Sequence, residues 1–197
     1  SEELKALCDT MNRYRNATIN YVFGDVKEPL TGETICSWMT GSQGTAVILD
    51  QEKVTAFVAG LAGKYDTAGT ARTFHTAGGR DVEITGPYGW KLDVAGEVAA
   101  LTQLIQAGLG EGEQDREPVY AATAASRSLP DWGNTYVEID LTGQHVYMFQ
   151  EGNLVWEAPC VTGNIAKNYN TPAGIYSLTY KEMDRILRGA KKADGTY

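Results

Sequence analysis

The sequence predicts an α+β amino-terminal part followed by antiparallel strands that begin a mainly β carboxy-terminal part. Helical and strand patterns alternate through the first 128 residues. From residue 132 onward, the pattern changes to short alternating runs that are separated by turn residues. Thr142-Gly143 and Glu151-Gly152-Asn153 separate three such runs, which cover residues 136–141, 145–149 and 154–161. Alternating runs joined by tight turns are typical of an antiparallel meander.

The composition excludes several classes of function. The 197 residues carry a net charge of −8, with 43% hydrophobic and 21% charged residues, which is ordinary for a folded soluble protein. Because nucleic-acid binding needs a basic surface, we expect no nucleic-acid partner. No apolar run reaches the ~18 residues of a membrane span, and the acidic start at Ser1 is not a signal peptide. An export segment or anchor upstream is compatible with this start.

Cysteine and histidine spacing predicts no metal site and no other cofactor. The three cysteines are widely spaced without a Cys-x-x-Cys pair, and the histidines are only His75 and His145.

Three helices are predicted in the first part of the chain. Apolar side chains recur there at three- and four-residue spacing. Asp50 and Asp93 precede the second and third helices as N-cap residues, and Gly108 ends the third. The predicted helices cover residues 2–15, 51–65 and 94–107.

Strands and turns fill the remaining sequence. Residues 72–76 and 81–85 are predicted to pair as a hairpin around Ala77-Gly78-Gly79. The other predicted strands cover residues 17–23, 46–49, 118–123 and 175–180. Loops are predicted at residues 29–32, 40–44 and 86–90, with an acidic loop or linker at 111–117 and an inter-domain linker at 124–130.

Specific residue strings give a family resemblance. The carboxy-terminal strings are TYVEIDL (135–141), QHVYMF (144–149), VTGN (161–164) and TPAGIY (171–176). In this order they resemble the opening half of a YkuD-type L,D-transpeptidase catalytic domain. Residues 34–107 resemble the peptidoglycan-binding domain that often precedes it. That likeness rests on Ile35, Trp38, Lys64-Tyr65-Asp66-Thr67, Arg72-Thr73-Phe74 and, most specifically, Tyr88-Gly89-Trp90-Lys91-Leu92-Asp93.

The resemblance implies a division of the chain and a function. Residues 1–128 would form an α+β peptidoglycan-binding domain, and residues 129–197 the first part of a YkuD-like β-sandwich. Such enzymes cross-link peptidoglycan stem peptides through a cysteine thioester and an acceptor amine. Their cysteine follows a His-Gly pair downstream of the TPxG strand. We therefore expect the catalytic domain to be incomplete and this chain to be inactive, with no catalytic residue of its own.

The same resemblance implies partners and a location. The partner would be peptidoglycan, through its stem peptides or glycan, at an extracellular site in the cell wall or on the outer face of the cytoplasmic membrane. A non-enzymatic peptidoglycan-binding module is the alternative function. An incomplete sheet exposes an edge and an apolar face, predicted to bear Tyr147, Phe149, Leu154 and Trp156. We expect either a loosely ordered carboxy-terminal part or, as we favour, an edge-to-edge homodimer.

Tyr88, Trp90 and Tyr169 are the candidate substrate-binding residues. Tyr88 and Trp90 have flat rings beside Gly86 and Gly89 that suit stacking on sugars or peptide planes, although a core role for Trp90 is the favoured alternative. Tyr169 lies in the polar loop 162–170, which would border the catalytic cleft of a complete transpeptidase.

Cys160 and His145 would be the reactive pair of an unrelated cysteine hydrolase, the third hypothesis. A two-residue turn at Glu151-Gly152 would place His145 opposite Ala158 and diagonal to Cys160. Cys160 follows Ala158-Pro159 rather than His-Gly, and no nearby charge stabilises a thiolate. We therefore interpret Cys160 as a small buried hydrophobe and His145 as a strand residue.

Overall fold

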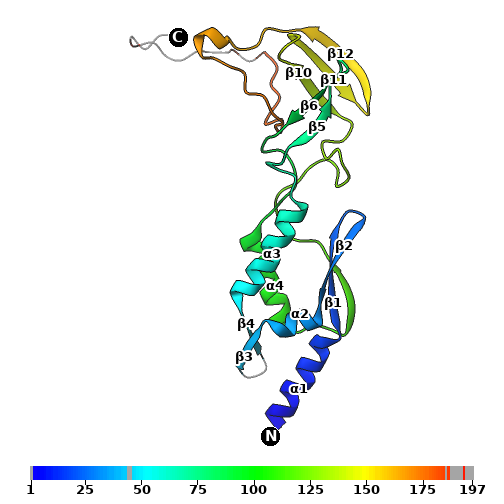
Figure 1. Ribbon diagram of the computed structural model, residues 1–197, viewed down its shortest axis with the longest axis vertical. Helices are drawn as coiled ribbons and strands as arrows, with labels where there is room; N and C mark the ends of the chain where they lie inside the picture. The colour runs from blue at the N-terminus through cyan, green and yellow to red at the C-terminus, as the bar shows by residue number, and fades with distance from the viewer. Residues whose placement is uncertain (1, 44–45, 185, 187–192, 194–197) are drawn as a thin grey trace.

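The computed structural model describes residues 2–43, 46–184, 186 and 193. Figure 1 shows an elongated molecule with helices in its lower part and an antiparallel sheet in its upper part. We call residues 2–65 and 91–122 the lower body, and residues 72–84 and 131–180 the upper body. Within the described residues, no helix is long and apolar enough to cross a membrane.

A three-stranded sheet forms one layer of the lower body. Its central strand β1 (Ala17–Phe23) coincides with the predicted strand. It pairs antiparallel with β2 (Val26–Thr31) and parallel with β8 (Gly112–Arg116).

The loop predictions for residues 29–32 and 111–117 were wrong, because β2 and β8 occupy most of these segments. β2 lies at the sheet edge, where the missing N–H of Pro29 is tolerated. β8 has the sequence GEQDR and no apolar alternation. Its position depends on tertiary contacts, since Arg116 pairs with buried Glu97 and the N–H of Gly112 donates to the carbonyl of Asn16.

The three predicted helices are confirmed with their bounds. The carboxylate of Asp50 accepts hydrogen bonds from the N–H groups of Glu52 and Lys53, and Asp93 caps its helix through Gly96. Gly108 ends the last helix with φ 103°, a conformation that favours glycine. The helices are α1 (Glu2–Arg15), α3 (Gln51–Tyr65) and α4 (Val94–Ala107).

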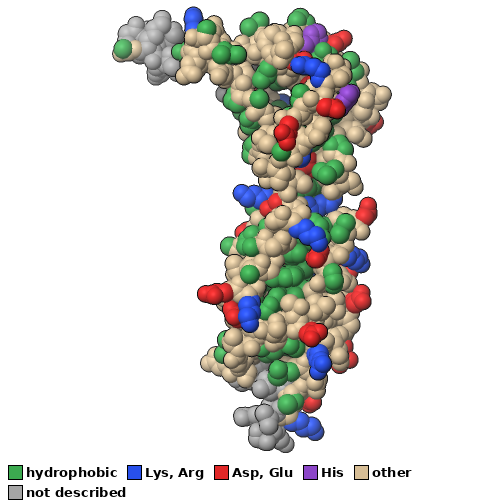
Figure 2. Space-filling view, in the orientation of Figure 1, with side chains coloured by type: hydrophobic (Ala, Val, Ile, Leu, Met, Phe, Trp, Pro, Cys, Tyr) green, Lys and Arg blue, Asp and Glu red, His purple; other side chains and the backbone are tan. Residues whose placement is uncertain are grey.

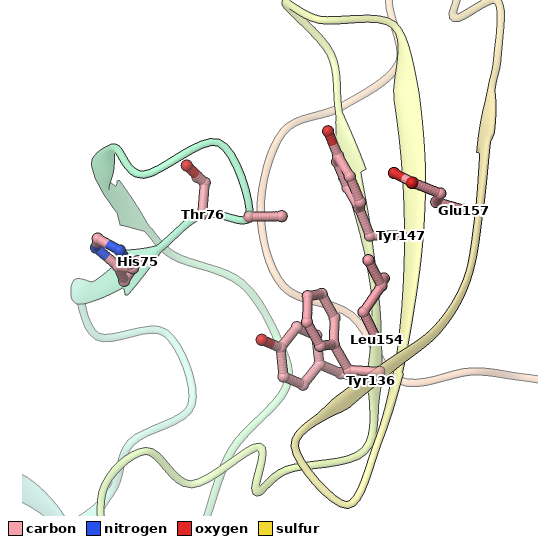
Figure 3. Close-up of a pocket in the computed structure, with 8 residues that line it drawn as sticks. His75, Thr76, Tyr136, Tyr147, Leu154 and Glu157 are labelled. Atoms are coloured by element: carbon pink, nitrogen blue, oxygen red, sulfur yellow. The ribbon is translucent and has the colours of Figure 1, made fainter.

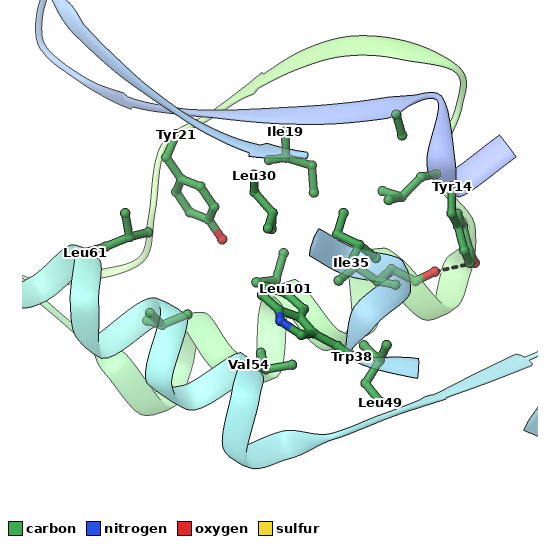
Figure 4. Close-up of a cluster of buried hydrophobic side chains, with 14 of the residues drawn as sticks. Tyr14, Ile19, Tyr21, Leu30, Ile35, Trp38, Leu49, Val54, Leu61 and Leu101 are labelled. Atoms are coloured by element: carbon green, nitrogen blue, oxygen red, sulfur yellow. Dashed lines mark hydrogen bonds between the residues drawn. The ribbon is translucent and has the colours of Figure 1, made fainter. Parts of the chain in front are cut away.

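The apolar core lies between this sheet and helices α3 and α4 (Figure 4). The short helix α2 (Gly32–Ser37) adds Ile35, and Trp38 follows it into the core with 4% of its surface exposed. Tyr14, at the end of α1, donates a hydrogen bond from its hydroxyl to the carbonyl of Ile105 at 2.6 Å. The buried members of this core, among the described residues, lie between Tyr14 and Leu109, so the core belongs to the lower body.

A hairpin of β3 (Met39–Gln43) and β4 (Ala46–Leu49) follows α2. The turn prediction was therefore wrong for residues 40–43, which are paired in a strand; Gly44 lies outside the described residues. Val47 and Leu49 of β4 are buried, which anchors the hairpin to the core.

The hairpin of β5 (Arg72–His75) and β6 (Asp81–Ile84) is confirmed. It leaves the lower body between α3 and α4 and lies beside the upper sheet (Figure 1). β7 (Lys91–Leu92) then pairs with β9 (Tyr120–Ala122), the predicted returning strand.

The predicted meander is also confirmed. β10 (Tyr136–Asp140), β11 (His145–Gln150) and β12 (Asn153–Pro159) form an antiparallel sheet in that order. Glu151 and Gly152 make a two-residue turn with φ values of 51° and 80°, as the primed hairpin turns require. A one-turn 3₁₀ helix, η1 (Ile165–Lys167), follows the sheet.

A β-bulge changes the predicted register of β12. The register shifts between Met148 and Phe149, so that His145 lies opposite Pro159 and not opposite Ala158. Because side chains alternate along a strand, the extra residue exchanges the two faces of β12 beyond the bulge.

The bulge also corrects the predicted apolar face. Tyr147, Phe149 and Leu154 lie on the inner face of the sheet, which is turned toward the β5–β6 hairpin. Trp156 lies opposite Met148 on the outer face and is 54% exposed, so its predicted place beside the other three was wrong. We define the outer face by its exposed apolar residues Val137, Ile139, Met148 and Trp156.

The strand predicted at residues 175–180 is not formed, although these residues are described. The N–H of Ile175 in this segment donates to the carbonyl of Thr85, which follows β6, at 3.1 Å.

Candidate functional site

A cleft of about 520 Å³ opens between the end of β5 and the inner face of the upper sheet. Figure 3 shows the hairpin on one side of the cleft and the sheet on the other. The volume lies within the range of small-ligand sites. Its lining residues are His75, Thr76, Ala77, Tyr136, Tyr147, Phe149, Leu154 and Glu157.

Strand pairing arranges the sheet side of the cleft in two cross-strand rows. The first row is apolar, because Phe149 lies between Tyr136 and Leu154. The rings of Tyr136 and Phe149 stack with centroids 4.9 Å apart. In the second row, Tyr147 lies between Glu138 and Glu157. The site therefore places an aromatic surface beside carboxylates.

Glu138 connects the sheet to the hairpin. Glu138 is only 7% exposed. Both oxygens of its carboxylate accept the N–H of Ala77, at 3.1 and 3.0 Å. Burial raises the pKa of Glu138, the Ala77 N–H lowers it less, and the charge of Asp140 raises it further. Arg80 donates to Asp140 at 2.9 Å and adds a second link between the two elements.

The two histidines lie near the cleft with acidic neighbours. The Nδ1 atom of His75 lies 2.7 Å from Asp81 Oδ1, and the Nε2 atom of His145 lies 3.2 Å from Glu157 Oε2. Figure 2 shows both histidines in the upper body with acidic side chains beside them. The lower body shows basic and acidic side chains interspersed on the visible face, rather than one basic surface.

Asp131 is the centre of the junction between the two bodies. Its side chain is fully buried and accepts two hydrogen bonds from Nη1 of Arg72, at 2.8 and 2.7 Å. The hydroxyl of Thr67 also donates to this carboxylate. Arg72 further donates to the carbonyl of Tyr88 at 2.7 Å. The Asp131 carboxylate thus connects the segments that contain Thr67, Arg72 and, through Arg72, Tyr88.

The predicted binding residues Tyr88 and Trp90 lie at this junction. The hydroxyl of Tyr88 accepts the N–H of Ala125 at 2.9 Å. Trp90 is half-buried, and its indole N–H donates to the carbonyl of Ser126 at 2.7 Å. Arg127 lies 4.5 Å from the Trp90 ring centroid. The predicted linker thus packs closely on these rings.

Tyr169, the third predicted binding residue, lies elsewhere. It follows η1 in the segment after the sheet and is 70% exposed. The structure therefore places Tyr88 and Trp90 close together and leaves Tyr169 separate from them in the upper body. None of the three lines the cleft.

Comparison with protein families gives two matches in the predicted order. The family described as "Putative peptidoglycan binding domain" matches residues 2–113, more than half of the chain. The L,D-transpeptidase catalytic domain, YkuD, matches residues 134–195. The chain belongs to the peptidoglycan-binding family, and its carboxy-terminal part is similar to the L,D-transpeptidase catalytic domain. It is thus part of an enzyme that cross-links peptidoglycan, and peptidoglycan is its partner.

Two solved structures of L,D-transpeptidases resemble this chain over most of its length. The carbamoyl enzyme of Ldtfm with avibactam is 29% identical, has a TM-score of 0.71, and matches 94% of this chain and 71% of its own. A cysteine-to-serine mutant of Enterococcus faecium L,D-transpeptidase is 28% identical and has a TM-score of 0.69. The match covers 96% of this chain and 72% of that structure's chain. No curated protein sequence matches the chain.

The transpeptidase part does not bring Cys160 and His145 together as a reactive pair. After the bulge, Cys160 follows Pro159, the residue opposite His145, so Cys160 and His145 belong to opposite faces. The Cys160 N–H donates to the carbonyl of Gln144, and its thiol is half-buried. No cysteine in the 197 residues follows a His-Gly pair, which is the pattern expected for the transpeptidase nucleophile.

Sequence reasoning missed the charged residues at the cleft and at the junction between the two bodies. Asp131 follows a predicted linker, and Glu138 occupies a polar position in an alternating strand. Val137 and Ile139 are exposed on the outer face, so Glu138 between them faces the hairpin. The role of Glu138 becomes visible only from this arrangement. Within the described residues, no cluster of three or more His, Cys, Asp or Glu side chains could hold a metal ion.

Proposed function

We propose that this chain is the wall-binding and substrate-positioning part of an L,D-transpeptidase. The supporting observation is that a peptidoglycan-binding family and a transpeptidase family match successive parts of one chain. Residues 1–128 would bind the wall, and residues 129–197 would supply one side of a catalytic domain. This boundary is our proposal; the β5–β6 hairpin, which precedes it in sequence, packs on the second part.

The thioester chemistry would not use any cysteine in this chain. Cys8 is exposed on α1, Cys36 is half-buried in α2 with a pKa raised by burial, and Cys160 lies on the opposite face of the sheet from His145. A protein of residues 1–197 should show no transpeptidation and form no adduct with a carbapenem. Intact-mass measurement after carbapenem exposure tests this expectation, and a stable adduct on Cys160 would contradict it.

Tyr88, Trp90 and Tyr169 are the proposed wall-binding residues. Of these, the exposed ring of Tyr169 is the most accessible for stacking. Tyr169→Ala should reduce retention on purified peptidoglycan without changing the thermal melt. Tyr176→Ala, which removes another half-exposed ring of the same segment, is the matched control. For Trp90→Ala, loss of retention with an unchanged melt would identify a ligand platform, and a lowered melt would identify a packing role.

A non-enzymatic wall-binding module is the second candidate function. The observation in its favour is that the peptidoglycan-binding match covers the whole apolar core of the lower body. Retention of residues 1–128 alone on purified peptidoglycan would support it. If only the full chain is retained, the upper body contributes to binding, as expected for a transpeptidase.

The proposed location is extracellular, in the cell wall or at the outer face of the cytoplasmic membrane, where peptidoglycan lies. We also propose that copies of this chain pair edge to edge. Among the described strands, β10 and β12 each pair only with β11, so both outer edges are open. Light scattering over a concentration series tests this, since a strictly monomeric particle would exclude the dimer.

A further inference from the structure

We propose that the turn at residues 86–90 is a connector that positions residues 171–176 of the transpeptidase part, with Gly86 and Gly89 as its positioning residues. The turn lies within the peptidoglycan-binding match, and residues 171–176 lie within the transpeptidase match. The connector therefore fixes how these two parts of the chain are placed relative to each other. The inference rests on the proposed function only for the roles of the two parts.

One side of the turn is joined to the segment that follows α3. The N–H groups of Thr67 and Ala68 both donate to the carbonyl of Trp90, at 2.9 and 3.1 Å. Gly89 is buried at this crossing with φ 142°. A Cβ on Gly89 would lie 2.7 Å from the hydroxyl oxygen of Thr67 and 2.8 Å from the Cα of Ala68. Glycine is the residue that combines this backbone conformation with so close an approach.

The other side of the turn meets residues 171–176. The N–H of Ile175 donates to the carbonyl of Thr85 at 3.1 Å, and the N–H of Gly69 donates to the carbonyl of Gly86 at 2.8 Å. A Cβ on Gly86 would lie 2.8 Å from the backbone nitrogen of Ile175 and closer still to its carbonyl oxygen. Real Cβ contacts are essentially never shorter than 3.0 Å. Because Gly86 does not have a positive φ, the approach of Ile175 alone requires glycine at this position.

Gly174 makes the same crossing from the opposite side. Its φ of 142° favours glycine, and a Cβ on it would lie 2.5 Å from the carbonyl oxygen of Thr85. Gly174 and Ile175 are half-buried, whereas residues 171–173 and 176–180 around them are exposed. In Figure 1 the chain after η1 runs back toward the β5–β6 hairpin, where this contact lies. The segment is thus held at the turn chiefly by a close crossing of two backbones.

The crossing also places the loop that carries Tyr169. The N–H of Gly163 donates to the hydroxyl of Thr171 at 2.9 Å, and a Cβ on Gly163 would lie 2.9 Å from the backbone nitrogen of Thr171. The loop between these two residues is therefore closed at its neck. Because Thr171 lies close in sequence to Gly174, the connector sets the position of the loop together with that of the crossing.

Hydrogen exchange of the backbone amides tests the connector on the full chain. Gly86→Ala and Gly174→Ala disturb the same crossing from its two sides, and each should speed exchange of the Ile175 amide by about tenfold. This change corresponds to the loss of about one ordinary hydrogen bond. The amides of β1 and α4 should keep their exchange rates within about twofold, because the core of the lower body is not part of the crossing.

Two glycines at the tip of the β5–β6 hairpin are the matched controls. Gly78 has no positive φ, and a Cβ on it would have its nearest neighbour at 3.9 Å, so Gly78→Ala is the control for Gly86→Ala. Gly79 has φ 77°, and among the described residues a Cβ on it would meet nothing within 4 Å. Gly79→Ala is therefore the control for the positive φ of Gly174. Neither control should change the exchange of the Ile175 amide.

Three outcomes would overturn the connector. The first is unchanged exchange of Ile175 in both crossing variants, and the second is equal acceleration in Gly78→Ala. The third is faster exchange throughout β1 and α4, which would show that the glycines support global stability and not the position of residues 171–176.

Retention on purified peptidoglycan separates this inference from the proposed function. A chain that shows the expected exchange pattern without being retained would support the connector and remove the wall-binding function. A chain that is retained without this pattern would remove only the connector.

Discussion

Arg72 and Asp131 form an ion pair that is buried on both sides, with 7% and 0% of the two side chains exposed. Nη1 of Arg72 donates to both carboxylate oxygens, at 2.8 and 2.7 Å. Arg72 begins β5, and Asp131 lies in the segment that leads to β10. The pair therefore joins the inserted hairpin to the segment that leads into β10, across 59 residues of sequence.

Asp131→Ala should strongly destabilise the upper body. It would leave the guanidinium of Arg72 buried without its charge partner, a change that typically costs about 3–5 kcal/mol. Urea unfolding followed by tryptophan fluorescence measures this, because Trp132 lies beside Arg72, 6.0 Å from its guanidinium carbon.

Asp140→Ala is the matched control. It removes the other carboxylate that pairs with a hairpin arginine, but Arg80 is 50% exposed; the loss also includes the hydrogen bonds that Asp140 accepts from the N–H groups of Thr142 and Gly143. Exposed ion pairs contribute about 0–1 kcal/mol. Equal losses for the two variants would show that the buried pair has no special role.

The helices and tight turns could be predicted because their causes are local. Asp50 and Asp93 cap α3 and α4, and Glu151-Gly152 makes the hairpin turn, all through residues close in sequence. β8 could not be predicted, because its pairing with β1 depends on buried Glu97, which also binds Tyr21 and Val119. Such a contact leaves no trace in a local pattern.

The candidate site was predicted less well than the fold. A single β-bulge moved Trp156 and Cys160 to the opposite face from Leu154, and no turn rule reveals a bulge in advance. The cleft also needs the β5–β6 hairpin to pack on β10, a contact between residues about 60 positions apart, as for Ala77 and Glu138. Its aromatic and acidic residues therefore looked like ordinary strand residues.

Glu138→Gln should change how stability depends on pH. The folded-state pKa of Glu138 is raised, mainly by burial, so the protonated form is favoured in the fold. Its contribution to stability is present below the unfolded-state pKa and is lost as pH rises through the folded-state pKa. The variant should thus become more stable relative to the original protein as pH rises from about 4, the ordinary range of a glutamate. The amide oxygen can still accept the N–H of Ala77.

Urea unfolding of both proteins across this pH range checks the prediction. The difference between them isolates Glu138, since all other titrating groups are shared. A difference that is constant with pH, or that falls toward neutral pH, would contradict it.

Trp156→Ala should cost little stability and should reduce self-association. The ring is 54% exposed on the outer face, so its loss should cost about 1–2 kcal/mol, less than the usual 3–5 for a buried aromatic. Leu101→Ala in the fully buried core should cost about 2–5 kcal/mol and serves as the comparison. Sedimentation velocity measures the association. Unchanged dimerisation in Trp156→Ala would show that the outer face does not take part in pairing.

Residues 1–128 should fold cooperatively without the rest of the chain. The apolar core lies wholly within residues 14–109, and Arg127 is retained to pack on Trp90, Tyr120 and Phe23. A non-cooperative thermal melt of this fragment would contradict the proposed domain boundary.

The substitution Arg72→Met should affect stability differently in the fragment of residues 1–128 and in the full chain. In the full chain, Arg72→Met leaves Asp131 buried and unpaired, and we expect a loss of about 3–5 kcal/mol. In residues 1–128 Asp131 is absent, so the same substitution removes a guanidinium that has lost its partner and should be neutral or stabilising. Thermal melts of the four proteins give both effects. Equal destabilisation in the fragment and the full chain would show that Arg72 supports the lower body through its own contacts, and not through Asp131.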